Sequence, residues 1–229
     1  MKTIGLLGGM SWESTGLYYR LINQETRRRL GGLHSAPIAM VSVDFQPIEE
    51  LQHRGDWPAA TEILIRHAQQ VEAAGADFLL ICTNTMHKIA PQVEAAIDIP
   101  LLHIADATAK ATHDDGLSSI GLLGTRFTME QNFFRERLEQ HGFQVLIPAA
   151  EDRELLHRII YDELCLGIVR ETSRDTLLRI ISDLNCSGAE GTVAGCTEIG
   201  MLIQQEHLAT PLFDTTVIHA LAAVSEALR

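Results

Sequence analysis

The segment GADFLLICTNTMHK (residues 75–88) joins a glycine, an apolar run and a cysteine that is followed by small polar residues. Short runs of Leu, Ile and Phe between breaking residues are typical of buried strands. A second segment, GAEGTVAGCTEIGM (188–201), has the same layout and also ends in a Cys-Thr pair. Ligands bind beyond the carboxyl ends of the strands in open α/β sheets. Each Cys-Thr pair is therefore predicted to lie at the ligand-binding end of a sheet.

The rest of the chain follows the pattern of βα units around a parallel sheet, in which β-rich apolar runs alternate with longer amphipathic segments. One helix is expected to begin with Ser14 as its cap, and another to begin near Pro58 and end at Gly75. Buried parallel strands read as continuous Val, Ile and Leu runs. The expected strands cover residues 3–8, 38–44, 77–82, 100–104, 119–124, 143–148, 191–196 and 211–214.

The two halves of the chain resemble each other in three places that occur in the same order. The pairs are IGLLGGMSWES (4–14) with IGLLGTRFTME (120–130), GADFLLICTNT (75–85) with GAEGTVAGCTE (188–198), and IPLLHIADAT (99–108) with TPLFDTTVIH (210–219). A repeat this long indicates two similar lobes, not a solenoid. We expect an α/β protein with two pseudo-symmetric lobes, each a parallel sheet flanked by helices, and an active site between them. The predicted lobes are 1–98 with 210–229, and 99–209.

Composition narrows the classes of function. The 229 residues carry 18 Lys and Arg against 30 Asp and Glu, a formal charge of −12, which disfavours nucleic-acid and anionic-membrane partners. No apolar run reaches the roughly twenty residues of a membrane span, and the Gly-rich start does not resemble a signal peptide. The four cysteines lack CxxC spacing, which argues against a zinc ribbon. The expected location is the reducing cytoplasm.

Two cysteines at equivalent strand ends indicate a specific chemistry. If Cys82 and Cys196 lie on opposite faces of an α-carbon, one thiolate removes the hydrogen and the other thiol supplies one from behind, which inverts the centre. Each cysteine changes role for the reverse reaction, so a near-symmetric pair is required. A helix is expected to start after each cysteine, where free N–H groups suit a carboxylate and the positive end lowers the pKa of the thiol.

The motifs LLGGMSWEST, CTNTMHK and GCTEI together resemble the aspartate/glutamate racemase family, over residues 3 to about 219. The resemblance implies a cofactor-independent isomerase that acts on free amino acids and forms homodimers. The ten histidines show no HxxxH or HExxH spacing, so no metal site is expected. Carried over by motif, Cys82 and Cys196 resemble the acid/base pair. The residues that resemble those holding the α-carboxylate are Thr83, Asn84, Thr85 and Thr197. The residues that resemble the wall formed by the first loop are Met10 and Ser11.

Departures from the family pattern concern the substrate side chain. The sequences GGMS and CTE place the chain on the aspartate-racemase side. Such relatives hold the distal carboxylate of the substrate with an arginine and a lysine. This chain has Glu49 or Glu50 near the position of the arginine and Cys165 near the position of the lysine. Gln52, His53 or Arg54, which are expected to lie in a loop, replaces these groups or admits a neutral side chain. Glu198 orients a thiol or the substrate ammonium, or caps the following helix.

Alternative interpretations stay open at this point. Hydantoin racemase, maleate isomerase and arylmalonate decarboxylase are related enzymes that this chain could represent. Arylmalonate decarboxylase uses one catalytic cysteine, so the two found here argue against it. A non-catalytic amino-acid-binding protein is the main alternative from another class, while GLLGGM lacks the glycines and lysine of nucleotide-binding loops. It is interpreted instead as a tight turn that lets the backbone approach a small substrate. Of the remaining candidates, Cys186 and Cys165 are interpreted as structural, with Cys165 also a candidate for lining the pocket, and His87 and His103 as helix-face or core residues.

Overall fold

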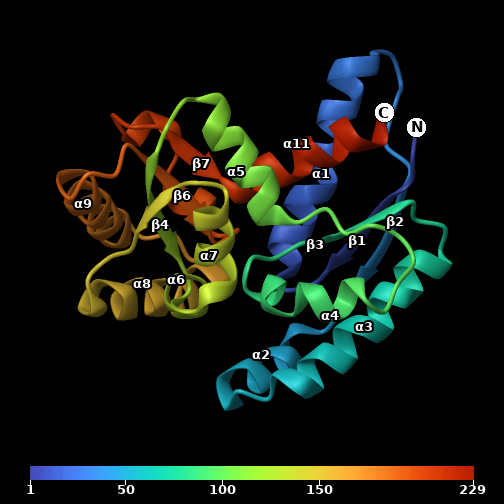
Figure 1. Ribbon diagram of the computed structural model, residues 1–229, viewed down its shortest axis with the longest axis horizontal. Helices are drawn as coiled ribbons and strands as arrows, with labels where there is room; N and C mark the ends of the chain where they lie inside the picture. The colour runs from blue at the N-terminus through green and yellow to red at the C-terminus, as the bar shows by residue number, and fades with distance from the viewer. The chain divides into compact units, whose positions relative to one another are not determined.

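The computed structural model describes residues 1–229 and divides into two compact units (Figure 1). Unit 1 comprises Met1–Ile104 and His219–Arg229, and unit 2 comprises Ala105–Ile218. The repeat had placed the lobe boundaries after residues 98 and 209. Both crossings of the chain between the units fall within helices, α5 (Ile104–Asp114) and α11 (Thr215–Ala227).

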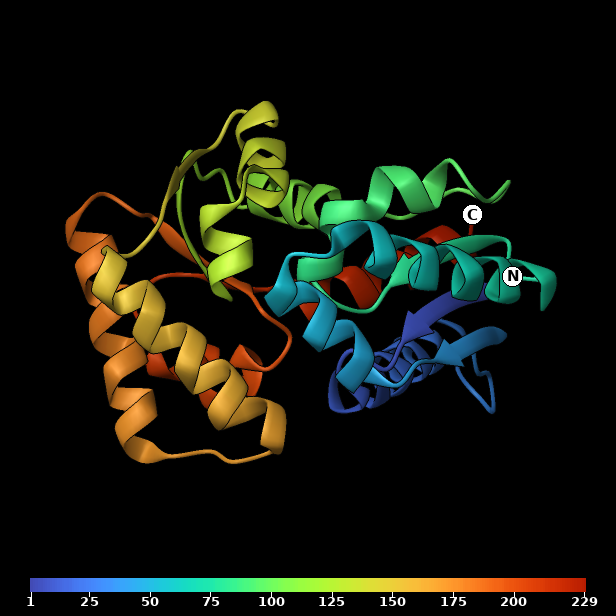
Figure 2. The ribbon, with the colours of Figure 1, turned by 90° about the horizontal axis from the view of Figure 1, so that it is seen from below.

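Unit 1 contains a parallel three-stranded sheet in the order β2-β1-β3. Helices α1 and α11 pack on one face of this sheet, and α2, α3 and α4 pack on the other. Figures 1 and 2 show α1 and α3 on opposite sides of the strands. The elements are β1 (Ile4–Gly8), α1 (Trp12–Leu30), β2 (Ile38–Ser42), α2 (Phe45–Arg54), α3 (Trp57–Ala73), β3 (Phe78–Ile81), the 3-10 helix η1 (Thr85–Ile89) and α4 (Ala90–Glu94).

The alternation of side chains along β3 decides which layer Cys82 faces. Successive residues of a strand point to opposite faces of the sheet. Leu79 and Ile81 belong to the apolar cluster with α3, whereas Leu80 belongs to the cluster with α1 and α11. Cys82 continues the second set and packs in the cluster that contains Tyr18 of α1. One register thus places the thiol in the α1–α11 layer.

Unit 2 contains a parallel four-stranded sheet in the order β5-β4-β6-β7. Residues of α8 and α9 form one apolar cluster with Leu123 of β4, Ala194 of β6 and Cys196. The elements are β4 (Ser119–Gly124), α6 (Arg126–Glu130), α7 (Asn132–Gln140), β5 (Gln144–Leu146), α8 (Ala150–Asp162), the 3-10 helix η2 (Leu164–Leu166), α9 (Glu171–Cys186), β6 (Gly191–Gly195), α10 (Ile199–Leu202), the 3-10 helix η3 (Gln205–His207) and β7 (Leu212–Asp214).

The two sheets have corresponding strand orders, as the internal repeat predicts. The first repeated segment is central in each sheet, as β1 and β4, and the cysteine segments follow as β3 and β6. The predicted α/β class with two parallel sheets flanked by helices is confirmed. None of the helices combines the length and the apolar character needed to cross a membrane.

Three local predictions are wrong. The expected strand at 100–104 is reduced to an isolated bridge between Leu101 and Leu79, because α5 already begins at Ile104. Helix α1 is capped by Ser11, whose hydroxyl accepts from the Ser14 N–H, so the helix begins before Ser14. Residues 45–54, which include the expected Gln52-His53-Arg54 loop, form α2 with Asp44 as its cap.

Candidate functional site

The segment after β3 forms a compact turn that carries the candidate residues of unit 1. Cys82 extends the sheet through its N–H, which donates to the Leu7 carbonyl at 2.9 Å. The Thr83 N–H then donates to the Ile81 carbonyl at 2.9 Å, which reverses the chain. Asn84 precedes η1, which begins at Thr85. All four side chains from Cys82 to Thr85 are buried, so this strand end presents one thiol and three small polar groups in a row.

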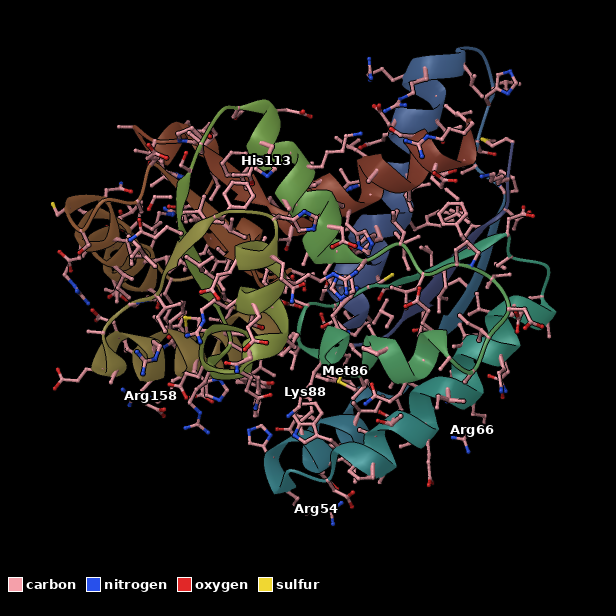
Figure 3. The ribbon with its side chains drawn as sticks, in the orientation of Figure 1. Arg54, Arg66, Met86, Lys88, His113 and Arg158 are labelled. Atoms are coloured by element: carbon pink, nitrogen blue, oxygen red, sulfur yellow. The ribbon has the colours of Figure 1, made fainter.

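Gln52 reaches the same segment from α2. Its side chain is buried, and its Nε2 donates to the sulfur of Met86 in η1 at 2.8 Å. Figure 3 shows Met86 on this segment, with Lys88 beyond it and Arg54 on α2. His53 and Arg54 are exposed and contact their own helix, at Glu49 and at the Glu50 carbonyl. Of the three neighbouring candidates in α2, Gln52 is therefore the one that the fold brings to η1.

The glycine-rich first loop is explained by packing against the protein itself. Gly9 has a φ of +97°, and a Cβ there would lie 2.2 Å from the Val43 carbonyl oxygen. Its N–H donates to the Thr15 hydroxyl at 2.8 Å. Met10 belongs to the apolar cluster with α3, and Ser11 caps α1. The loop thus needs glycine to pass Val43, a contact that the interpretation as an approach to a small substrate did not foresee.

The expected electrostatic effect of a helix on each thiol is not found. The cysteines are followed by a five-residue 3-10 helix and by the four-residue α10, not by long helices. Burial raises the pKa of Cys82, because it disfavours the charged thiolate. Burial is also the largest cause of the raised pKa of Cys196, so the predicted lowering of the thiol pKa is not found for either cysteine.

A group of buried histidines behind the Cys82 turn was not recognised as a group in the sequence. His87 is joined to the Thr83 carbonyl at 2.7 Å through Nδ1, and its Nε2 accepts from the Ile104 N–H at 3.3 Å. The rings of His87 and His103 lie 4.5 Å apart between their centroids. Of the two roles predicted for these histidines, helix-face or core, their burial matches the core. The spacing of these histidines along the chain did not indicate that they form a group, because the fold brings them together.

His219 of α11 completes this group. Its Nδ1 lies 2.8 Å from the Tyr18 hydroxyl and its Nε2 lies 2.8 Å from the Leu102 carbonyl. Because a carbonyl only accepts, Nε2 carries the hydrogen and Nδ1 accepts from Tyr18. Burial lowers the pKa of His219 to about 4, so the ring is neutral at pH 7.

The candidate residues of unit 2 form a hydrogen-bonded cluster at the end of β6. The Cys196 thiol donates to Oε2 of Glu198 at 3.1 Å, and the Thr197 hydroxyl donates to the same oxygen at 2.6 Å. All three side chains are buried. Glu198 is the residue before α10, but its side chain makes no cap bond to that helix. Of the roles predicted for Glu198, the geometry matches contact with the thiol and not capping.

Cys165 in η2 and Asp214 at the end of β7 lie near this cluster. Burial, followed by the negative charge of Glu198, raises the pKa of Cys165 to about 12. Burial, followed by Glu198 and then Cys165, also raises the pKa of Cys196. Asp214 caps α11 by accepting from the Thr216 N–H at 2.8 Å, and its Oδ2 would lie 2.4 Å from a Cβ on residue 200, which is Gly200. The sequence indicated Asp214 only as the last residue of a strand.

Two further side chains lie outside these clusters. Cys186, interpreted as structural, lies exposed at the end of α9 and not in a core. Lys88 of η1 has its Nζ 3.8 Å from the centre of the Trp57 ring. No three His, Cys, Asp or Glu side chains in residues 1–229 are grouped as a metal site requires.

Comparison with known proteins gives consistent results. A family model described as Asp/Glu/Hydantoin racemase matches residues 7–223. A crystal structure of a candidate Asp/Glu racemase from Yersinia pestis is 55% identical and that of an aspartate racemase homologue from Pyrococcus horikoshii is 31% identical, with TM-scores of 0.93 and 0.87 and full coverage of both chains. A broad-specificity amino-acid racemase from Bacillus subtilis is 22% identical over 97% of this chain and 96% of its own. The resemblance inferred from the motifs, and with it the isomerase class, is confirmed at the level of the family.

Proposed function

The chain belongs to the Asp/Glu/Hydantoin racemase family, and from this premise we propose that it interconverts the enantiomers of a free amino acid without a cofactor, with Cys82 and Cys196 as the proton-transfer groups. One observation carries the proposal. In each unit a buried Cys-Thr pair follows directly after the equivalent strand, β3 or β6, which pairs with the central strand β1 or with β4. The inversion of a stereocentre needs two such groups, one for each face of the α-carbon.

The neighbouring polar residues would hold the substrate. Thr83, Asn84, Thr85 and Thr197 offer neutral donors for the α-carboxylate, whose fixed placement stabilises the carbanionic transition state. The remaining proposed substrate contacts are Met10, Ser11, Gln52, Cys165 and Glu198. The raised pKa of both cysteines is compatible with this role, because the α-ammonium group of a bound amino acid is a positive charge that favours the thiolate.

The residues proposed for the side-chain end favour a broad substrate range. Gln52 and Cys165 are uncharged groups at neutral pH and do not provide the cation that a second carboxylate requires. Aspartate and glutamate therefore compete with amino acids that have neutral side chains. The names of the relatives cover both cases, since they include an aspartate racemase homologue and a broad-specificity racemase.

The setting of the reaction belongs to the same proposal. The four cysteines are free, as in a reducing cytoplasm. Trp12, Tyr19 and Leu33 are large apolar side chains exposed on unit 1, which supports a homodimer. Sedimentation analysis of the purified protein checks the dimer, and a monomer at micromolar concentration contradicts it.

Deuterium exchange tests the racemase proposal directly. Single enantiomers of aspartate, glutamate, homoserine and other amino acids are incubated with the protein in deuterium oxide, together with a 5-substituted hydantoin for the related racemase reaction. The expected result is racemisation of an amino acid with deuterium at Cα. Binding without exchange would indicate an amino-acid-binding protein instead, and turnover of the hydantoin alone would indicate the related enzyme.

Variants assign the two cysteines. Cys82→Ala and Cys196→Ala should each abolish racemisation, because one face of the α-carbon loses its proton-transfer group. Each variant should retain Cα exchange from one enantiomer only, and the two variants should differ in which one. Cys186→Ala is the matched control, since that thiol lies exposed at the end of α9. Normal racemisation by either Cys82→Ala or Cys196→Ala refutes the assignment.

A further inference from the structure

The two proposed proton-transfer thiols differ in their immediate surroundings. The Cys196 thiol donates to Oε2 of Glu198 at 3.1 Å, whereas Cys82 packs in the apolar cluster with Tyr18 and Ala220. Burial accounts for the raised pKa of Cys82, while the charge of Glu198 adds to burial at Cys196. Two cysteines at equivalent strand ends thus have different access to a second proton-binding group.

The Glu198 side chain is a hydrogen-bond partner of the sulfur. Its Oε2 receives hydrogen bonds from both Cys196 and Thr197, and the side chain makes no cap bond to α10, although Glu198 directly precedes that helix. It is almost fully buried, at 4% exposure. A carboxylate held at hydrogen-bond distance from a thiol has the geometry that proton transfer needs.

We propose that Glu198 exchanges a proton with Cys196 during the racemisation proposed above, on which this inference rests. When Cys196 acts as the base, its S–H bond breaks, an O–H bond forms on Oε2 of Glu198, and the electron pair stays on sulfur. The thiolate then takes the hydrogen of the enantiomer that faces it, and the electron pair of the C–H bond stays on Cα. Cys82 supplies a hydrogen to the other face.

The reverse direction uses the same atoms. The Cys82 thiolate takes the hydrogen on its face of Cα, while Cys196 gives its hydrogen to Cα and becomes a thiolate. The O–H bond of Glu198 then breaks, and its proton returns to the sulfur of Cys196. No further reactant is required, because the proton moves between two side chains that already share it. A thiolate beside an ionised Glu198 would put two negative charges within one hydrogen bond, which a buried site disfavours. In both directions the pair carries only one negative charge while Cys196 is a thiolate, because Glu198 is then protonated.

Substitutions of Glu198 test the proposal. Glu198→Gln keeps the size and hydrogen-bonding capacity of the side chain but cannot accept a proton at neutral pH. We expect kcat to fall by about 10²–10⁴-fold at pH 7, the range of general acid–base assistance, and to recover as the pH rises and solvent removes the thiol proton. Glu198→Asp should retain more activity than Glu198→Gln. Glu206→Gln, an exposed glutamate in η3, is the matched control and should leave kcat unchanged.

Chemical rescue separates proton transfer from a structural role. Glu198→Ala opens space beside Cys196, and added formate should restore activity in proportion to its concentration, whereas chloride at the same ionic strength should not. Wild-type kcat in Glu198→Gln, or a low activity of Glu198→Ala that formate does not raise, overturns the inference. Both results leave the racemase proposal intact if Cys196→Ala is inactive. Absence of racemisation by the wild-type protein, in contrast, overturns the racemase proposal and this inference with it.

Discussion

Replacement of Gly9 by alanine should destabilise unit 1 through two separable effects. The left-handed φ of +97° costs an L-residue about 1–2 kcal/mol. The new methyl group would also lie 2.2 Å from the oxygen and 2.4 Å from the nitrogen of Val43, so backbone must shift, at a further cost of about 1–3 kcal/mol. The two costs add, so the free energy of unfolding should fall by about 2–5 kcal/mol.

Gly75→Ala provides a matched control in the same unit. Gly75 has a φ of +89°, but a Cβ there meets nothing within 4 Å, so only the conformational cost applies. Urea unfolding followed by circular dichroism should show Gly9→Ala to be less stable than Gly75→Ala by about 1–3 kcal/mol. The melting temperatures should differ by about 2–4 °C for each kcal/mol. Equal losses in the two variants would refute the argument from the contact with Val43.

Three further results are expected. Tyr18→Phe removes the hydroxyl that donates to Nδ1 of His219 and should cost about 1–3 kcal/mol in urea unfolding, whereas Tyr19→Phe, at an exposed site, should cost almost nothing; similar losses contradict the role of the bond. Because the pKa of His219 falls from 6.5 to about 4 on folding, its contribution to stability is complete above pH 6.5 and declines toward pH 4, by at most about 3 kcal/mol; a His219→Asn variant with the same pH dependence as the wild type contradicts this. One cysteine, Cys186, should react rapidly with a thiol reagent at pH 8, and a Cys186→Ser variant that keeps the fast phase would show that another thiol is accessible.

Local pattern determined much of the architecture. The apolar runs that end in Cys82 and Cys196 become β3 and β6, and the repeat of the first segment corresponds to the central strands β1 and β4. These features follow from sequence because the burial of a parallel strand requires a continuous apolar run, and a repeated run builds a similar sheet. The position of the two Cys-Thr pairs directly after these strands could likewise be predicted, because the end of a strand fixes where the next residues lie.

Contacts between distant segments were decided by the tertiary structure alone. The run at 100–104 had the composition of a strand, but it forms only a bridge because α5 starts at Ile104. The pKa of each buried thiol rises where a helix end was expected to lower it, because burial is a property of the packed fold. The bond from Tyr18 to His219 joins residues at opposite ends of the chain. Periodicity reports which face of an element is buried, whereas the partner that covers it depends on how the elements pack.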